Sequence, residues 1–264
     1  MDTPYWQRQS AGKPLFPDLL WSRPENRTAA GKLLIIGGNA YGFAAPAEAY
    51  QATERAGIGV ARVLLPDALK HTVGKVLEAG DFAPSTPSGS FSQKALDSFL
   101  LQSAWADGVL LAGDLGRNSE TAILLEKFLE KYTGQLTLTK DAADYAIASP
   151  SYILKRPETS LAISLAQLQK LAINAHFPHP FTFGMDLLRL VDSLHAFGEL
   201  YPVHIVVKHL DMIFVAVGGA VSSTKLEASL DIWRVATAAR ASVWWLQNPR
   251  KPFQALTTAV YETV

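Results

Sequence analysis

Two glycine-rich turns, each following a short apolar run, are the first candidates for chemistry in this sequence. One is Gly37-Gly38-Asn39-Ala40-Tyr41-Gly42, after Leu33-Leu34-Ile35-Ile36, and the other is Gly113-Asp114-Leu115-Gly116. Glycines that follow a strand let backbone N–H groups close on a phosphate. The first turn has neither the three-glycine spacing of a dinucleotide fingerprint nor the Gly-Lys-Ser/Thr of a P-loop. An ordinary turn is the alternative interpretation of each.

Metal and thiol chemistry have little support in the sequence. The chain has no cysteine, which excludes disulfides, thiolate nucleophiles and cysteine-based metal sites. His176 and His179 have a spacing that could chelate a metal, but no carboxylate stands at ligand spacing beside them. We therefore expect a loop packed by proline and aromatic residues there, and no metal site.

The charge and hydropathy of the whole chain limit its partners. The formal net charge is +0, from 24 basic and 24 acidic residues. A neutral chain gives no electrostatic reason to expect nucleic acid or an anionic membrane as a partner. No apolar stretch approaches the roughly 20 residues that span a bilayer. The first residues lack the basic and apolar regions of a signal peptide, so we expect a cytoplasmic protein.

Apolar runs and helical patterns alternate along the chain, which predicts a mostly parallel sheet with helices on both faces. The predicted fold is α/β, a Rossmann-like three-layer α/β/α sandwich. Strands are expected at 33–36, 60–65, 108–112, 136–139, 205–208, 213–217 and 220–223. Helices are expected at 46–56, 67–78, 119–132 (with Ser119 as its cap), 142–148, 232–246 and 252–261. Residues 1–30 lack a clear period and are expected to form an N-terminal arm beside a single domain of residues 31–264.

Several segments of the chain follow a common pattern in a fixed order. They are the first glycine turn running through Ala44-Ala45-Pro46 to Arg55-Ala56-Gly57-Ile58-Gly59, the turn at 107–117, the strand end at 136–144, Val206-Val207-Lys208, and Val235-Ala236-Thr237 followed by 252–255. Together they resemble the signatures of the ADP/ATP-dependent NAD(P)H-hydrate dehydratase family. The resemblance extends from about residue 24 to 262.

This resemblance implies a ribokinase-like fold and the repair of hydrated NADH and NADPH, from which the family eliminates water at the expense of ADP or ATP. It also implies a nucleotide or NAD(P)H-hydrate as ligand, Mg²⁺ as a companion of the nucleotide, and a homo-oligomer. The positions that match substrate contacts are Asn39, Ala45, Asp114 and Ser164. Those that match nucleotide contacts are Lys208, His209, Thr237, Ala238, Ala239, Arg240 and Ala241. Ser242 stands at the position of the family's catalytic Asp.

The chain departs from the family at the residues that carry its chemistry. The family's Thr-Gly-Gly-Ser-Gly-Asp loop is Thr237-Ala238-Ala239-Arg240-Ala241-Ser242 here, and Ser164 and Gln167 replace a His and a Glu. A Cβ narrows the approach of a phosphate, and a Ser hydroxyl without an activating partner is no base near neutral pH. We therefore expect a divergent homologue that is impaired in catalysis and retains at most nucleotide or metabolite binding. An active dehydratase is the alternative.

Residues 237–242 also have a simpler interpretation. They fit an ordinary amphipathic helix that starts at Ser229 or Asp231, on which Arg240 is solvated rather than paired with a phosphate. Trp244 and Trp245 follow on the same helix. Three interpretations of this tryptophan pair stay open: it packs in the core, forms an interface, or fills the former nucleotide pocket.

Overall fold

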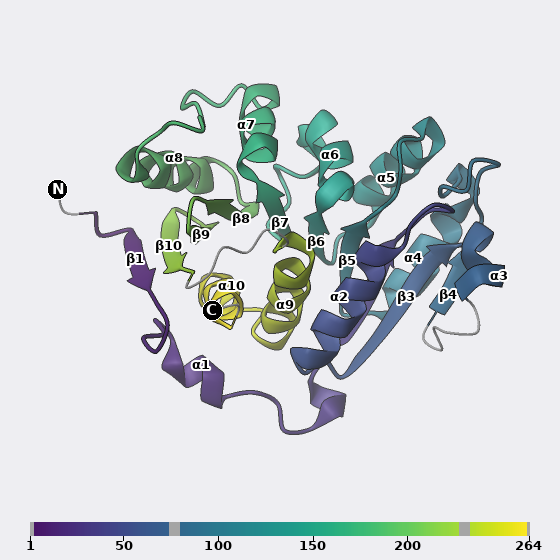
Figure 1. Cartoon of the computed structure of the whole chain (residues 1–264), viewed down its shortest axis with the longest axis horizontal. Coiled ribbons are helices and arrows are strands. Elements are labelled where there is room, and N and C mark those ends of the chain that lie inside the picture. The colour runs from purple at the N-terminus through teal and green to yellow at the C-terminus, as the bar shows by residue number, and fades with distance from the viewer. Residues whose placement is uncertain (1–2, 74–79, 227–232, 263–264) are drawn as a thin grey trace.

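A sheet of ten strands runs through the centre of the computed structural model (Figure 1). The structure describes residues 3–73, 80–226 and 233–262, and the ten strands belong to this part of the chain. They are β1 (Trp6–Gln9), β2 (Lys32–Gly37), β3 (Val60–Pro66), β4 (Gly80–Ala83), β5 (Gly108–Gly113), β6 (Gln135–Thr139), β7 (Thr159–Ser164), β8 (His204–His209), β9 (Met212–Val217) and β10 (Ala220–Lys225).

The strands lie in the order β1-β10-β9-β8-β7-β6-β5-β2-β3-β4. Neighbouring strands are parallel, except that β9 runs antiparallel to both β8 and β10. Because parallel neighbours need crossover connections, helices separate most of the strands along the chain. The mostly parallel α/β sheet predicted from the sequence is confirmed.

Helices cover both faces of this sheet (Figure 1). They are α1 (Pro17–Trp21), α2 (Ala44–Arg55), α3 (Lys70–Val73), α4 (Leu96–Trp105), α5 (Ser119–Lys131), α6 (Lys140–Ala148), α7 (Leu165–Asn174), α8 (Leu187–Leu200), α9 (Arg234–Gln247) and α10 (Pro252–Tyr261). Leu34 and Ile36 of β2 pack in the core on the side of α4–α8, whereas Leu33 and Ile35 pack on the side of α2, α9 and α10. Burial on both sides explains why residues 33–36 of β2 are all apolar.

Some elements differ from those expected. Strands β1, β4 and β7 and helices α1, α4, α7 and α8 are additional. The helix expected at 67–78 is a 3₁₀ turn, Asp67–Leu69, followed by α3, and residues 74–79 lie outside the described part. Helix α5 is capped by Asn118 rather than Ser119, because the Asn118 side chain accepts the N–H groups of Glu120 and Thr121. None of the described helices combines the length and apolar character needed to cross a bilayer.

The first part of the expected arm joins the sheet as β1. It pairs in parallel with β10, from Trp6 opposite Val221 to Gln9 opposite Thr224. The buried Gln9 side chain donates from Nε2 to Thr224 Oγ1 at 2.7 Å and to the carbonyl of Thr257 at 2.8 Å. These bonds tie β1 to both the sheet and α10.

Candidate functional site

The two glycine-rich turns meet at the carboxyl ends of β2 and β5. The strand order reverses here, because the chain continues from β2 to β3 on one side and returns to β5 on the other. Such a switch point leaves a crevice in which α/β proteins bind ligands. Gly38 N donates to Gly113 O at 2.9 Å, and a Cβ on Gly37 would lie 2.5 Å from that same oxygen. The absence of a side chain at Gly37 therefore permits this close approach.

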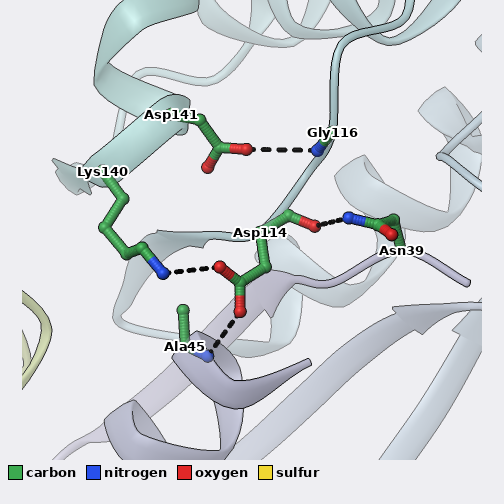
Figure 2. Close-up of polar contacts among 6 residues, drawn as sticks. All are labelled: Asn39, Ala45, Asp114, Gly116, Lys140 and Asp141. Carbon is green, nitrogen blue, oxygen red and sulfur yellow. Dashed lines mark hydrogen bonds and ion pairs between the residues drawn. The ribbon is translucent and has the colours of Figure 1, made fainter. Parts of the chain in front are cut away.

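Asp114 is the centre of a polar network in this crevice (Figure 2). Its Oδ2 accepts the backbone N–H of Ala45, in the first turn of α2, at 2.7 Å. Its Oδ1 lies 2.5 Å from Lys140 Nζ, and Asn39 Nδ2 donates to its main-chain oxygen at 2.6 Å. The structure thus brings together Asn39, Ala45 and Asp114, three of the four predicted substrate positions. Lys140 and the amino end of α2 neutralise the charge of Asp114 within the protein.

Asp141, in the first turn of α6, is the second carboxyl group of the crevice (Figure 2). Its Oδ2 accepts the N–H of Gly116 at 3.1 Å, whereas its Oδ1 is buried without a hydrogen-bond partner among the described residues. Burial is the main cause that raises the pKa of Asp141, and the nearby Asp114 raises it further. A buried carboxyl group with a raised pKa beside a crevice is a candidate for proton transfer.

A cavity of about 350 Å³ lies at the carboxyl ends of β7 and β8. Its lining consists of Ser164, Leu165, Ala166, Phe183, Lys208, His209, Leu210 and Trp233. Ser164 caps α7, since its Oγ accepts the N–H of Gln167 at 3.2 Å, and the next two residues form the first turn of that helix. A lysine, a helix amino end and two aromatic side chains therefore share one cavity. This combination suits a phosphate and a flat organic ring.

Gln167 connects this cavity to the Asp114 network. Its Nε2 donates to the carbonyl of Lys140 at 2.8 Å and to Asp144 Oδ1 at 2.9 Å. Its Oε1 accepts from the Arg234 guanidinium, at the start of α9, at 3.1 Å. A continuous row of polar contacts therefore runs along the carboxyl edge of the sheet, from Asp114 to Arg234.

The residues of this cavity fit a nucleotide better than a protein-bound Mg²⁺ ion. Among the described residues, no carboxylate lines the cavity, although Mg²⁺ in proteins is commonly held by one or two carboxylates together with substrate phosphates. Across residues 3–73, 80–226 and 233–262, no three His, Asp or Glu side chains gather as a metal-ligand set. At the expected histidine pair, the ring of His179 packs edge-on against Phe177 at 5.4 Å.

Residues 237–242 lie in the interior of α9, so the interpretation of this segment as an ordinary helix is confirmed. The described helix begins at Arg234, and the expected starts Ser229 and Asp231 lie outside the described residues. Ser242 is buried and its Oγ donates to Ala238 O at 2.9 Å. The Ser242 carbonyl accepts from Gln135, the first residue of β6, so Ser242 lies toward the amino ends of the strands.

Ser242 is therefore distant from the Asp114 network, and a catalytic role for it is a prediction that this geometry does not support. The same holds for nucleotide contacts by the other buried residues of the segment. These are Thr237, Ala238, Ala239 and Ala241, none of which lines the cavity beside Lys208. By contrast, Ser164, Lys208 and His209 do share that cavity.

Arg240 is half-buried rather than solvated. Its Nε has no hydrogen-bond partner in the described structure. Burial is the largest cause that lowers the pKa of its guanidinium, Arg55 lowers it further, and Glu48 raises it. Both neighbours belong to α2, which packs against α9. The expected solvated position of Arg240 is therefore wrong.

Trp244 and Trp245 pack in the core, which decides among the three interpretations of the pair. Each is 1% exposed. The Trp244 indole donates to Glu262 at 2.7 Å, and Trp245 contacts the ring of His204, the first residue of β8, at 4.8 Å. Both lie at the amino ends of the strands, away from the cavity beside Lys208. Trp233, eleven residues before Trp244 on the chain, lines that cavity instead.

Sequence reasoning did not assign roles to Lys140 and Arg234. Lys140 directly follows the expected strand 136–139, at the sheet edge where ligands bind, and this position was a usable signal. Arg234 gave no such signal, because helical periodicity does not fix the residue at which a helix begins.

No protein-family model matches the sequence, and no curated protein matches it. Among solved structures, a ribokinase-like superfamily protein from Enterococcus faecalis V583 is similar at TM-score 0.72 and 15% identity, over 99% of this chain and 87% of the other. An ADP/ATP-dependent NAD(P)H-hydrate dehydratase from Bacillus subtilis, crystallised with ATP and Mg²⁺, has a TM-score of 0.61 and 12% identity, over 95% and 87%. A Bacillus subtilis pyridoxal kinase in complex with ADP has a TM-score of 0.54 and 9% identity, over 87% and 88%. These similarities establish the ribokinase-like fold.

Proposed function

We propose that this protein binds a nucleotide at the carboxyl edge of its sheet and is a divergent homologue of the NAD(P)H-hydrate dehydratases with impaired catalysis. The cavity that holds Ser164, Lys208, His209 and Trp233 carries this proposal. The lysine supplies positive charge for a phosphate, and the first turn of α7 supplies backbone N–H groups. Trp233 and Phe183 supply faces on which a base could stack.

The proposed loss of catalysis rests on the interactions of the carboxyl groups at the carboxyl edge of the sheet. Asp114 is held by Lys140 and by the backbone of Ala45, so its charge is already neutralised. In the part of the chain that the structure describes, no carboxyl group that could act as a base lines the Lys208 cavity. Loss of a positioned general base lowers a rate by about 10²–10⁴.

A second candidate function is an active ADP- or ATP-dependent dehydratase. The observation that favours it is Asp141, whose buried Oδ1 lacks a partner in the described structure and whose pKa is raised, mainly by burial. Such a carboxyl group can hold a proton at a pH where an exposed one has lost it. It would serve as a proton donor or acceptor in the crevice between β2 and β5.

Calorimetric titration of the purified protein with ADP and ATP tests the binding proposal. We expect saturable binding, weakened about tenfold or more in Lys208→Ala because a charged contact to phosphate is lost. The matched control is Lys170→Ala, an exposed lysine on α7 outside the cavity. Circular dichroism must show that both variants are folded. Absence of nucleotide binding by the folded wild-type protein would overturn the proposal.

Turnover of hydrated NADH, followed as recovered absorbance of NADH with ADP or ATP present, separates the two functions. With the Bacillus subtilis dehydratase as positive control, we expect a rate at least about 100-fold lower for this protein. A comparable rate that is abolished by Asp141→Asn would instead establish the second candidate.

A further inference from the structure

Three cationic side chains line a second pocket, at the opposite end of the strand order from the β3–β4 edge. Arg8, Lys13 and Lys225 share this pocket of about 320 Å³, which we call the edge pocket. Its remaining lining is Trp6, Gln9, Ser10, Leu187, Met212 and Ser223. None of these residues lines the cavity beside Lys208.

The pairing of β1 with β10 builds the edge pocket. Arg8 lies opposite Ser223 in the parallel register, and Lys225 lies two residues further along the same strand, so it points to the same face as Ser223. Lys13 is placed by a tight turn in which its N–H donates to Ser10 O at 2.9 Å. Gly12 adopts φ = +70° in that turn, a conformation that glycine allows. Cations distant in the sequence are thereby gathered on one face.

Trp6 fixes the guanidinium of Arg8 in the edge pocket. The Arg8 carbon Cζ lies 3.7 Å from the centre of the Trp6 ring. The indole N–H donates to Ser223 Oγ at 3.0 Å, which anchors the ring on the buried part of β10. A guanidinium held over an aromatic ring by a cation–π contact still carries N–H donors for an anion.

The charge of the edge pocket is unbalanced, although the whole chain is neutral. Among residues 3–73, 80–226 and 233–262, no Asp or Glu lines the edge pocket. Among the ion pairs of the described residues, none involves Arg8, Lys13 or Lys225. Two acidic residues adjoin the lining in sequence. Asp186, before Leu187, caps α8 and pairs with Arg189. Asp211, before Met212, directly precedes β9 and lies outside the described lining. Like charges gathered without a counter-charge repel each other and attract anions.

We propose that the edge pocket binds a small organic phosphate. The phosphate would lie against Arg8, Lys13 and Lys225, because a fixed guanidinium and ammonium groups match its charge and its acceptor oxygens. The apolar body would lie against Leu187, Met212 and Trp6, which form the rest of the wall. A volume of about 320 Å³ is at the lower end of the range for small-molecule sites.

This inference does not depend on the proposed nucleotide site. The two pockets share no lining residue, so Lys208→Ala should leave binding at the edge pocket unchanged. If the protein binds phenyl phosphate at the edge pocket but no nucleotide, only the nucleotide proposal fails. If it binds a nucleotide but no phenyl phosphate, only the edge-pocket proposal fails.

Titration with phenyl phosphate, observed by NMR of tryptophan indole N–H groups, tests the proposal. The Trp6 signal, assigned by its loss in Trp6→Phe, should shift saturably, since Trp6 lines the pocket. Benzyl alcohol, which lacks the phosphate, should produce no saturable shift. Inorganic phosphate should shift the same signal with weaker affinity, because it lacks the apolar body.

Variants and a polyanion complete the test. Arg8→Gln and Lys225→Gln should each weaken phenyl phosphate binding about tenfold or more, while the exposed control Lys170→Gln leaves it unchanged. Equal affinity in all variants, or no saturable shift of Trp6, would overturn the proposal. Binding of heparin alone, without binding of phenyl phosphate, would show that the pocket recognises a polyanionic macromolecule instead.

Discussion

Asp114 and Lys140 both have backbone conformations that are uncommon for their residue types. Their φ angles are 58° and 51°, in the left-handed region. Such a conformation costs about 1 kcal/mol or more for a residue other than glycine. The ion pair between them and the bond from Ala45 N–H to Asp114 offset this cost locally. The pair therefore joins the loop after β5 to the start of α6 and of α2.

The pKa of Asp141 should respond to this pair in two opposite directions. Asp114 is among the causes that raise the pKa of Asp141, and Lys140 is among those that lower it. Asp114→Asn should therefore lower the pKa of Asp141, and Lys140→Met should raise it. Titration followed by ¹³C NMR of the Asp141 carboxyl carbon measures both shifts. Shifts of the same sign in the two variants would contradict the geometry described.

At the scale of the elements, Gly37, the last residue of β2, allows the close approach of β2 to the end of β5. A Cβ at Gly37 would lie 2.5 Å from the backbone oxygen of Gly113, whereas a Cβ at Gly42 would meet no atom within 4 Å. Gly37→Ala should lower the free energy of unfolding by about 2–3 kcal/mol, because the two loops must separate. Gly42→Ala, the matched control, should change it by less than about 0.5 kcal/mol. Urea denaturation measures both, and equal effects would refute the close approach.

Helix α9 shows what a sequence can and cannot define at the scale of an element. Its existence was predictable, since Val235 to Gln247 combines alanines with apolar residues at helical spacing. The position of this helix relative to the family's phosphate loop was not predictable. Glycines mark where a loop ends and a helix begins, and in this sequence alanines replace them. The match therefore placed Ser242 at the ligand site, whereas packing places it against Gln135 at the other end of the sheet.

For the whole molecule, the mostly parallel sheet and its layers followed from alternating apolar runs, but three strands, β1, β4 and β7, lacked that signal. β7 (Thr159–Ser164) begins with the buried polar residues Thr159 and Ser160, so it does not read as an apolar run. The site was predicted only in part, because the sequence shows where strands end but not which strands are neighbours. Asn39, Ala45 and Asp114 follow strand ends that the glycine-rich turns mark. The contacts of Gln167 depend instead on β6 and β7 lying side by side.

His204 links the pH dependence of unfolding to the whole core. Burial lowers its pKa to about 4, and its ring packs on Trp245. The unfolded chain, with an ordinary pKa near 6.5, binds this proton more readily than the folded protein does. The stability contributed by the neutral ring is thus fully present above about pH 6.5 and is lost as the pH falls toward 4, by up to about 3 kcal/mol.

We therefore expect the free energy of unfolding of His204→Asn to fall less steeply than that of wild type between pH 6.5 and 4. Altered packing at this position should change that free energy by the same amount at every pH. His71→Asn, at an exposed position on α3, is the matched control and should follow the wild-type profile. Urea denaturation at several pH values measures the profiles. Parallel curves for wild type and His204→Asn would contradict the buried position of this ring.

Because β1 pairs with β10, it is synthesised long before its partner strand. β1 is made early, yet its only strand neighbour in the described sheet is β10, roughly 210 residues later in the chain. At about 5–20 residues per second, a nascent β1 waits on the order of ten seconds or more before β10 leaves the ribosome. Its sequence, Trp6-Gln7-Arg8-Gln9, carries a positive charge at Arg8, and charged side chains on an unpaired strand disfavour its association with other chains. Arg8, one of the three cations of the edge pocket, is therefore also expected to disfavour pairing of the unfinished chain with other chains.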